Sequence, residues 1–385
     1  MFDFTDEKLQ QLKAINTVRE IESQPKMWRK ALENYKNEKN SINTFLKKLN
    51  DEHGRIKVIF TGAGTSAYVG DTLFPYLNNL QDDKFVFETI ATTNIVSNPK
   101  QYLLNVPTLL VSFARSGNSP ESVAAVNLAN QLVDNIYHLA ITCAPDGKLA
   151  MDLKDKDNAY VLLMPEGTND KGFAMTSSFS SMFLSALMVF DKAHSDEEKS
   201  NLIEKISQLS EDIVNRETEI SKYLEKDFDR IVYLGSGSLA ALTREAQLKI
   251  LELTAGKIAT CFDSSMGFRH GPKSFVNENT LVFDFVSTDF YTRQYDVDII
   301  NEIHGDKIAK NIIAITNDKL DADFEQFVLN SDEKLPDVYL AMPYIVVAQT
   351  VAVMTSLKVK NTPDTPSATG TVNRVVKGVT IHNLD

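Results

Sequence analysis

Apolar residues along the chain follow two patterns. Short apolar runs bounded by turn residues alternate with longer segments in which apolar positions recur every three or four residues. The short runs of the first half lie at residues 57–61, 84–90, 106–112, 136–142 and 159–164. Runs of this kind predict buried strands, and the longer segments predict amphipathic helices. Regular alternation of strands and helices predicts a parallel, doubly wound α/β sheet.

The same pattern begins again near residue 230. The glycine-rich turn Gly62–Gly64 recurs as Gly235–Gly237, an offset of 173 residues. The apolar runs at 109–111 and 140–142 recur at offsets of 172 and 174. Three landmarks at nearly one offset indicate a duplicated α/β domain. We therefore expect two tandem doubly wound domains of the flavodoxin-like kind.

This reading divides the chain into four parts. A charged, periodic segment over residues 1–48 predicts an N-terminal helical arm, which packs either on its own chain or on a partner subunit. The first domain is expected over 49–205 and the second over 206–361. The remaining tail, 362–385, carries Lys377 between apolar residues, a pattern that predicts a strand folding back on the protein.

Composition narrows the classes of partner. The chain has 40 Lys plus Arg against 52 Asp plus Glu, so its formal net charge at pH 7 is −12. This balance argues against nucleic acid or an anionic membrane as a partner. A small phosphorylated ligand stays compatible with it, because a local anion site can outweigh a remote net charge.

Cysteine usage and the apolar segments bear on location. The two cysteines, Cys143 and Cys261, lack the spacing of metal ligands, which predicts buried thiols in a reducing compartment and no metal centre. The N-terminus lacks the basic and apolar regions of a signal peptide, and the longest uncharged stretch, 341–357, is too short to span a bilayer. We expect a cytoplasmic protein with 341–357 as a core helix.

The segment after the third predicted strand has the chemistry of an anion site. It reads Arg115-Ser116-Gly117-Asn118-Ser119-Pro120 and leads into a helix-forming run over 121–132. Free backbone N–H groups at a helix N-terminus, serine hydroxyls and an arginine together suit a phosphate. The alternative is an ordinary strand–turn–helix junction with serine as N-cap. The second domain has Asp289-Phe290-Tyr291-Thr292 instead, so phosphate binding is expected of the first domain only.

The second domain contains the residues suited to proton transfer. Glu245, Lys249 and Glu252 share one face of a predicted helix whose other residues are largely apolar. The alternative is a solvated face with a salt bridge. His270 lies in the predicted loop Arg269-His270-Gly271-Pro272, where either a structural role or proton transfer is open.

These motifs resemble the sugar isomerase (SIS) family. Gly64-Thr65-Ser66 and Ser116-Gly117-Asn118-Ser119 resemble its two phosphate-binding motifs, with Arg115 beside the second. The segment Gly172-Phe173-Ala174 resembles its third loop, which places Ala174 at the sugar. Further along the chain, the sequence also resembles the isomerase half of glucosamine-6-phosphate synthase. The resemblance implies catalytic roles for Lys249, Glu252, His270 and Lys377.

The residues within these motifs are most similar to those of one subgroup, named for tagatose-6-phosphate ketose/aldose isomerase and D-galactosamine-6-phosphate deaminase. Ala114 and Arg115 replace a Ser-Gln pair of the synthase, so the phosphate contacts are altered. The printed sequence contains no glutaminase domain, so the resemblance implies no transfer of nitrogen from glutamine. It implies a homodimer that shares its active sites, or a tetramer.

The expected reaction converts D-galactosamine 6-phosphate to D-tagatose 6-phosphate and ammonia. His270 opens the ring, Glu252 moves a proton from C2 to C1, and water releases ammonia; no step requires a metal or a cofactor. With a hydroxyl at C2, the same transfer is plain aldose–ketose isomerisation. Two other classes stay open: a non-catalytic sugar-phosphate sensor, and a nicotinamide-binding enzyme suggested by Gly62, Gly64 and Ala67.

Overall fold

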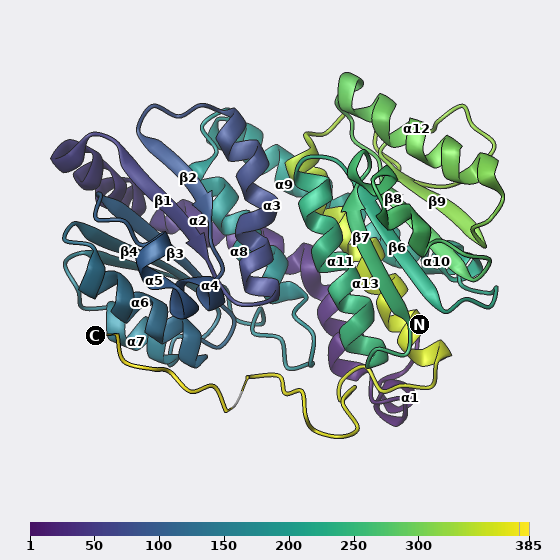
Figure 1. The fold of residues 1–385 in the computed structure, drawn as a ribbon, viewed down its shortest axis with the longest axis horizontal. Coiled ribbons are helices and arrows are strands. Elements are labelled where there is room, and N and C mark those ends of the chain that lie inside the picture. Colours follow the sequence, from purple (N-terminus) through teal and green to yellow (C-terminus); the bar gives the residue numbers. More distant parts are fainter. Residues whose placement is uncertain (377, 385) are drawn as a thin grey trace. The chain divides into compact units, whose positions relative to one another are not determined.

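The computed structural model describes residues 1–376 and 378–384, which form two compact units (Figure 1). The β1–β5 unit contains Lys26–Asp170, Ser177–Ser200 and the described residues from Gly370 on. The β6–β10 unit contains Met1–Pro25, Lys171–Thr176 and Asn201–Thr369. The long helix α2 (Ile15–His53) therefore contributes residues to both units.

The sheet of the β1–β5 unit is parallel throughout, with the strand order β2-β1-β3-β4-β5. Its strands are β1 (Ile56–Thr61), β2 (Phe85–Thr89), β3 (Thr108–Ala114), β4 (Ile136–Thr142) and β5 (Ala159–Leu163). Strand β3 begins two residues later than its apolar run, after Pro107, which has no N–H to donate. It continues to Ala114, which pairs with Thr142.

Helices cover both faces of this sheet (Figure 1). They are α3 (Thr65–Asn79), α4 (Thr92–Ser97), α5 (Pro99–Tyr102), α6 (Pro120–Leu132), α7 (Lys148–Leu153) and α8 (Ser177–Phe190). On one face Phe60 lies against Phe87 and Phe190 of α8, with ring centroids 5.6 and 5.5 Å apart. On the other face the strands contribute Leu110 and Ala140 to a core with α6 and α7.

The β6–β10 unit has the same topology. Its sheet contains β6 (Arg230–Gly235), β7 (Ala259–Ser264), β8 (Thr280–Phe285), β9 (Asn311–Thr316) and β10 (Glu325–Val328). The order β10-β9-β8-β6-β7 is the order of the first sheet read in the opposite direction. Two doubly wound parallel sheets are therefore present, as the alternation of apolar runs predicts.

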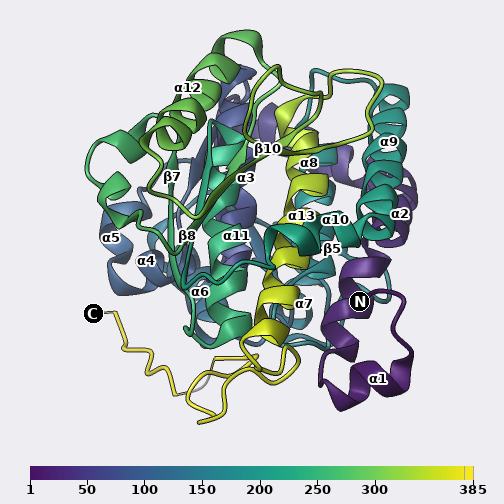
Figure 2. The same cartoon turned by 90° about the vertical axis from the view of Figure 1, so that its right-hand side faces the viewer.

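Side chains alternate between the two faces of this second sheet. On one face Phe285 stacks on Tyr344 of α13 (Asp337–Lys358), which lies beside α11 (Ser238–Thr254). On the other face Val282 packs with Ile299 of α12 (Phe290–Asp306). Figure 2 shows α11 and α13 side by side, with α12 across the strands from them. This unit also contains α1 (Asp6–Gln11), α10 (Glu217–Tyr223) and most of α9 (Asp196–Asn215).

Helix α13 is apolar and long enough to cross a membrane by length and composition, and is the one such helix among the described residues. However, 89% of its apolar window is buried within the protein. The Tyr344 hydroxyl donates to the carbonyl of Val286, and the Gln349 side chain accepts from Gln24. These contacts make α13 a core helix, as predicted for 341–357.

The tail differs from its prediction. No strand forms in the described residues between 370 and 384, so the expected strand around Lys377 is wrong for them. Val372, Val376 and Val379 are exposed. Valine favours a strand but does not form one without a partner strand, and no strand pairs with these residues in the described part of the chain.

Candidate active site

Two loops follow neighbouring strands at the carboxyl edge of the first sheet. Strands β1 and β3 pair in parallel, with Thr61 opposite Ser112, and each leads into a helix. A Cβ on Gly62 would lie 2.5 Å from the backbone of Ser66, and Gly64 has φ +57°, so the first turn requires glycine. Helix α3 begins at Thr65 without a side-chain cap. This edge therefore presents two helix N-termini, the usual setting for an anion.

The second loop is held by its own hydroxyls. Ser119 is the N-cap of α6, and its Oγ accepts from the Ser122 N–H at 3.3 Å. The Oγ of Ser116 accepts a 3.3 Å bond from the Asn118 N–H, and Gly117 has φ +65°. The Asn118 side chain accepts from the Lys148 N–H at 3.0 Å, which ties the loop to α7. Ser116 and Ser119 are half-buried, so their hydroxyls remain accessible to a ligand.

Arg115 is nearly buried, with 7% of its surface exposed. Its Nη2 donates to the backbone carbonyl of Arg374 at 2.7 Å. Arg374 in turn donates from Nε to the carbonyl of Asp170 and from Nη2 to Oδ1 of Asn169, both at 2.9 Å. The structure thus adds a contact that sequence patterns give no sign of: the tail packs on the arginine beside residues 116–119, the predicted phosphate loop.

The third loop is divided between the units. Asp170 belongs to the β1–β5 unit, where its carboxylate accepts from the N–H groups of Ser177 and Ser178 at 3.0 and 2.9 Å and so caps α8. Ala174 is fully buried in the segment Lys171–Thr176, which belongs to the β6–β10 unit. Its expected contact with a sugar stays a prediction.

Three charged residues meet on α11. The Lys249 Nζ lies 3.1 Å from Oε1 of Glu245 and 2.6 Å from Oε2 of Glu252. Glu245 and Lys249 are fully buried, whereas 24% of the Glu252 side chain is exposed. Burial by itself lowers the pKa of Lys249, but the two neighbouring carboxylates outweigh it, so the pKa is raised. Glu252 is thus a carboxylate within reach of solvent, oriented by a buried ammonium ion.

His270 lies on a loop of the same unit and is exposed. It follows the short helix η1 (Gly267–Arg269), and its N–H donates to the Gly267 carbonyl at 2.9 Å. Phe268 anchors the loop in the core, and Arg269 Nε lies 2.7 Å from Glu302 on α12. These contacts hold the loop in place, so the exposed imidazole of His270 has a defined position. Lys377 lies outside the described residues.

The second sheet has a carboxylate where its own loops meet. Asp296, on α12, accepts from Oγ of Ser236 at 2.5 Å, from Oγ of Ser265 at 2.6 Å and from the Ser287 N–H at 3.0 Å. Ser236, Ser265 and Ser287 follow the ends of β6, β7 and β8. An internal carboxylate thus holds hydroxyl and N–H donors of the kind that suit a phosphate. Sequence analysis missed this arrangement; its signal is serine after three strands, with Asp296 on the next helix.

The structure also bears on metal and thiol chemistry. In the described part of the chain, no group of three His, Cys, Asp or Glu residues is arranged to hold a metal ion. The Cys143 thiol is buried, and burial raises its pKa to about 12. A thiol of that kind is inert as a nucleophile near neutral pH.

Comparison with known proteins defines the class. The family model described as the SIS domain matches residues 52–192. The chain is 46% identical over 378 residues to D-galactosamine-6-phosphate deaminase AgaS of Escherichia coli O157:H7, covering 95% of each sequence. The chain therefore belongs to the SIS domain family. It is also 42% identical to D-galactosamine-6-phosphate deaminase AgaS of Shewanella sp. strain ANA-3, covering 98% of this chain and 94% of that protein.

A solved structure supports the same placement. The crystal structure of tagatose-6-phosphate ketose/aldose isomerase from Escherichia coli aligns with a TM-score of 0.88 and 42% identity. The alignment covers 96% of this chain and 97% of that one. The resemblance read from the phosphate-binding and α11 motifs is confirmed at the level of family and fold.

Proposed function

We propose that this protein is an amino-sugar phosphate deaminase that converts D-galactosamine 6-phosphate to D-tagatose 6-phosphate and ammonia. The observation that carries the proposal is the pair on α11: Glu252, partly exposed, 2.6 Å from the buried ammonium of Lys249. The printed names of relatives that match over nearly the whole chain support the same reaction and sugar.

The phosphate is assigned to the β1–β5 unit. Its oxygens are assigned to the N-termini of α3 and α6 and to the side chains of Thr65, Ser66, Ser116 and Ser119. Gly64, Gly117 and Asn118 shape the two turns, and Arg115 supplies positive charge next to them.

The chemistry is a ring opening, a proton transfer from C2 to C1 and a hydrolysis. His270 transfers the proton that opens the pyranose to an aldehyde at C1. Glu252 then removes the C2 proton, which the carbonyl has made acidic, and the resulting enolamine has a double bond between C1 and C2. The protonated Glu252 returns the proton to C1, which leaves an imine at C2. Water adds to C2, the C–N bond breaks, and ammonia leaves the ketose 6-phosphate.

Lysines have supporting roles in this scheme. Lys249 orients Glu252 and keeps positive charge beside it. Lys377 is assigned to the open-chain substrate, where an ammonium stabilises negative charge that develops on the C1 oxygen. No protein group changes its oxidation state in these steps.

A substrate screen tests the function. Hexosamine 6-phosphates and ketohexose 6-phosphates of galacto and gluco configuration are incubated with the protein, and both ammonia and ketose are measured. Equal release of ammonia and tagatose 6-phosphate from D-galactosamine 6-phosphate supports the proposal. Interconversion of hexose 6-phosphates without ammonia identifies a plain isomerase, and binding without turnover identifies a sensor.

We also propose that the enzyme is a cytoplasmic homodimer that shares its active sites. Strand β7 is an edge strand, and apolar side chains close to Glu252 and His270 in sequence are exposed: Leu251 at 36%, Phe262 at 39% and Met266 at 45%. An exposed edge with apolar side chains is suited to cover by another chain. Mixing Ser116→Ala/Ser119→Ala chains with His270→Ala chains should restore part of the activity. No recovery after proven subunit exchange contradicts a shared site.

A further inference from the structure

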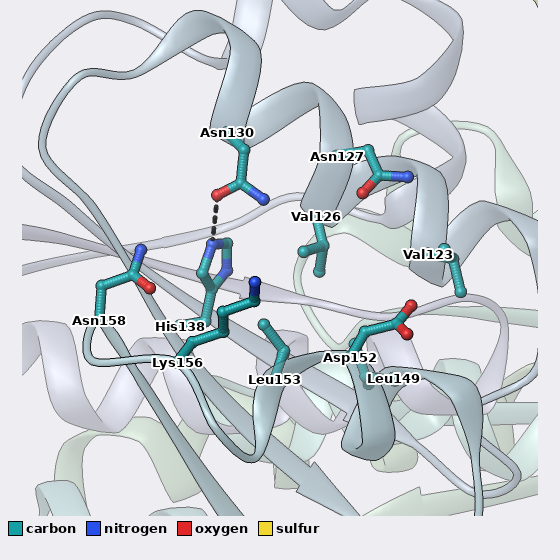
Figure 3. Close-up of a pocket in the computed structure, with 10 residues that line it drawn as sticks. All are labelled: Val123, Val126, Asn127, Asn130, His138, Leu149, Asp152, Leu153, Lys156 and Asn158. Carbon is teal, nitrogen blue, oxygen red and sulfur yellow. Dashed lines mark hydrogen bonds between the residues drawn. The ribbon is translucent and has the colours of Figure 1, made fainter.

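A cavity lies in the β1–β5 unit. It has a volume of about 470 Å³ and is bounded by α6, α7, strand β4 and the loop that leads to β5 (Figure 3). This volume is in the range of small-molecule sites. No residue of the proposed reaction lines it.

A buried histidine forms part of the cavity wall. His138 lies in the middle of β4, with 1% of its surface exposed, and its Nε2 is 2.9 Å from Oδ1 of Asn130. Since Oδ1 only accepts, Nε2 carries the proton and Nδ1 is an acceptor. Nδ1 is buried and has no hydrogen-bond partner among the described residues. Burial lowers the pKa of His138 to about 4, so the ring is neutral at pH 7.

Other polar groups face the same space. Figure 3 shows the carboxylate of Asp152, the ammonium of Lys156 and the amide of Asn127 around the opening, with His138 and Asn130 at one side. Asp152, Lys156 and Asn127 are exposed, and none makes a side-chain hydrogen bond or ion pair with another residue that the structure describes. One positive and one negative group leave the wall without net charge.

Apolar side chains supply the rest of the lining, namely Val123, Val126, Leu149 and Leu153. A neutral wall rich in donors and acceptors, next to an apolar strip, suits a ligand with many hydroxyl groups and a C–H face. Because the polar groups of the wall carry no net charge, the wall does not favour a phosphate or carboxylate ion over a neutral ligand. A monosaccharide has these properties.

We propose that the cavity between α6 and α7 is a binding site for a neutral, unphosphorylated monosaccharide. Asn130, Asp152 and Lys156 provide its hydrogen bonds, and His138 holds Asn130 in place. The site does not depend on the proposed reaction, because it uses none of the residues assigned to that reaction.

The site adjoins the phosphate loop through α7. The N–H of Leu149, a residue of the cavity wall, donates to the Gly117 carbonyl at 3.0 Å. The N–H of Lys148 donates to Asn118 at 3.0 Å. A ligand held between α6 and α7 therefore contacts helices whose first residues brace the phosphate loop.

Calorimetric titration of the full chain with D-galactose, D-glucose and myo-inositol tests the proposal. Binding of at least one of these probes is expected. Asp152→Ala should weaken it by about tenfold or more, because a hydrogen bond to a charged group contributes about 1.5–3 kcal/mol. Asp152 is exposed, so this variant should fold. Asp155→Ala, an exposed carboxylate in the same region but outside the wall, is the matched control and should bind as the native chain does.

A second variant separates the two sites. Ser116→Ala should leave probe binding unchanged, because Ser116 belongs to the phosphate loop. Absence of binding by all three probes overturns the proposal. So does binding that Ser116→Ala abolishes, or binding that Asp152→Ala leaves intact.

Discussion

The guanidinium of Arg115 donates a 2.7 Å hydrogen bond to the backbone carbonyl of Arg374, 259 residues further along the chain. The tail is thereby joined to the residue beside the phosphate loop. A backbone acceptor cannot be removed by changing the Arg374 side chain, so its contribution has to be tested by shortening the chain.

Two truncations measure what the tail does for Arg115. A chain ending at Val376 and a chain ending at Gly370 both lack Lys377, but the shorter one also lacks the carbonyl that Arg115 contacts. We expect the KM for the sugar phosphate to be roughly tenfold higher in the shorter chain, the usual effect of losing one charge-assisted hydrogen bond. Steady-state kinetics of the two chains make the comparison, and equal KM values would show that this contact does not position Arg115.

Ser116→Ala should raise KM much more than it lowers kcat. Its hydroxyl is assigned to the phosphate, which does not react, so ground state and transition state lose the same contact. Stability should hardly change, since the Oγ makes a long 3.3 Å loop bond. Ser119→Ala also removes the cap of α6 and should cost about 1 kcal/mol of unfolding free energy. Ser97→Ala, an exposed serine of the same unit, is the kinetic control.

Glu252→Gln should lower kcat by about 10² to 10⁴ and leave substrate affinity nearly unchanged, because glutamine keeps the size of the side chain but cannot accept the proton. Turnover in deuterated water should label C1 of the ketose with the native enzyme and not with this variant. Glu278→Gln, an exposed glutamate of the same unit, should behave as native. Near-native turnover and labelling by Glu252→Gln would place the base elsewhere, with Glu245 the first alternative.

Lys249→Met should destabilise the protein by about 3–5 kcal/mol, because it leaves the fully buried carboxylate of Glu245 without the ammonium at 3.1 Å. Adding Glu245→Gln removes that stranded charge and should recover much of the loss. Urea unfolding of the two variants gives the difference. A single variant as stable as the double variant would mean that Glu245 does not depend on Lys249.

Asp284 makes stability depend on pH. It is fully buried on β8, and burial together with the charge of Asp296 raises its pKa well above the usual value. The folded chain therefore holds a proton that the unfolded chain has lost, so the free energy of unfolding falls as pH rises above about 4. Asp284→Asn cannot titrate, and its stability relative to the native chain should increase with pH. Denaturation from about pH 4 to about pH 8 measures this; Asp321→Asn, at an exposed site, should show no such trend.

The local sequence pattern was sufficient to predict much of the fold. The strand positions, the start of α6 at Pro120 and the position of Ser119 as its N-cap follow from apolar runs and helix-start chemistry, which depend on neighbouring residues only. The close approach of Lys249 to Glu252 follows from helical spacing in the same way.

Long-range contacts could not be predicted from the local sequence pattern. The Arg115–Arg374 bond and the grouping of three serines around Asp296 join segments whose meeting depends on the folded sheet and tail. The tail was wrongly predicted as a strand because the apolar residues beside Lys377 favour a strand but do not supply a strand to pair with. The open acceptor of His138 also depends on which residues surround it after folding.

Because of the Asp296 carboxylate, the loops of the two sheets should differ in how far their order depends on bound sugar phosphate. The loops around Asp296 carry their own anion, so their order is independent of metabolite concentration. The loops at Ser66 and Ser116, which we assign to the phosphate, should gain further stability by mass action when a sugar phosphate binds. Without sugar phosphate, the predicted phosphate loop should therefore open locally more readily than the loops around Asp296.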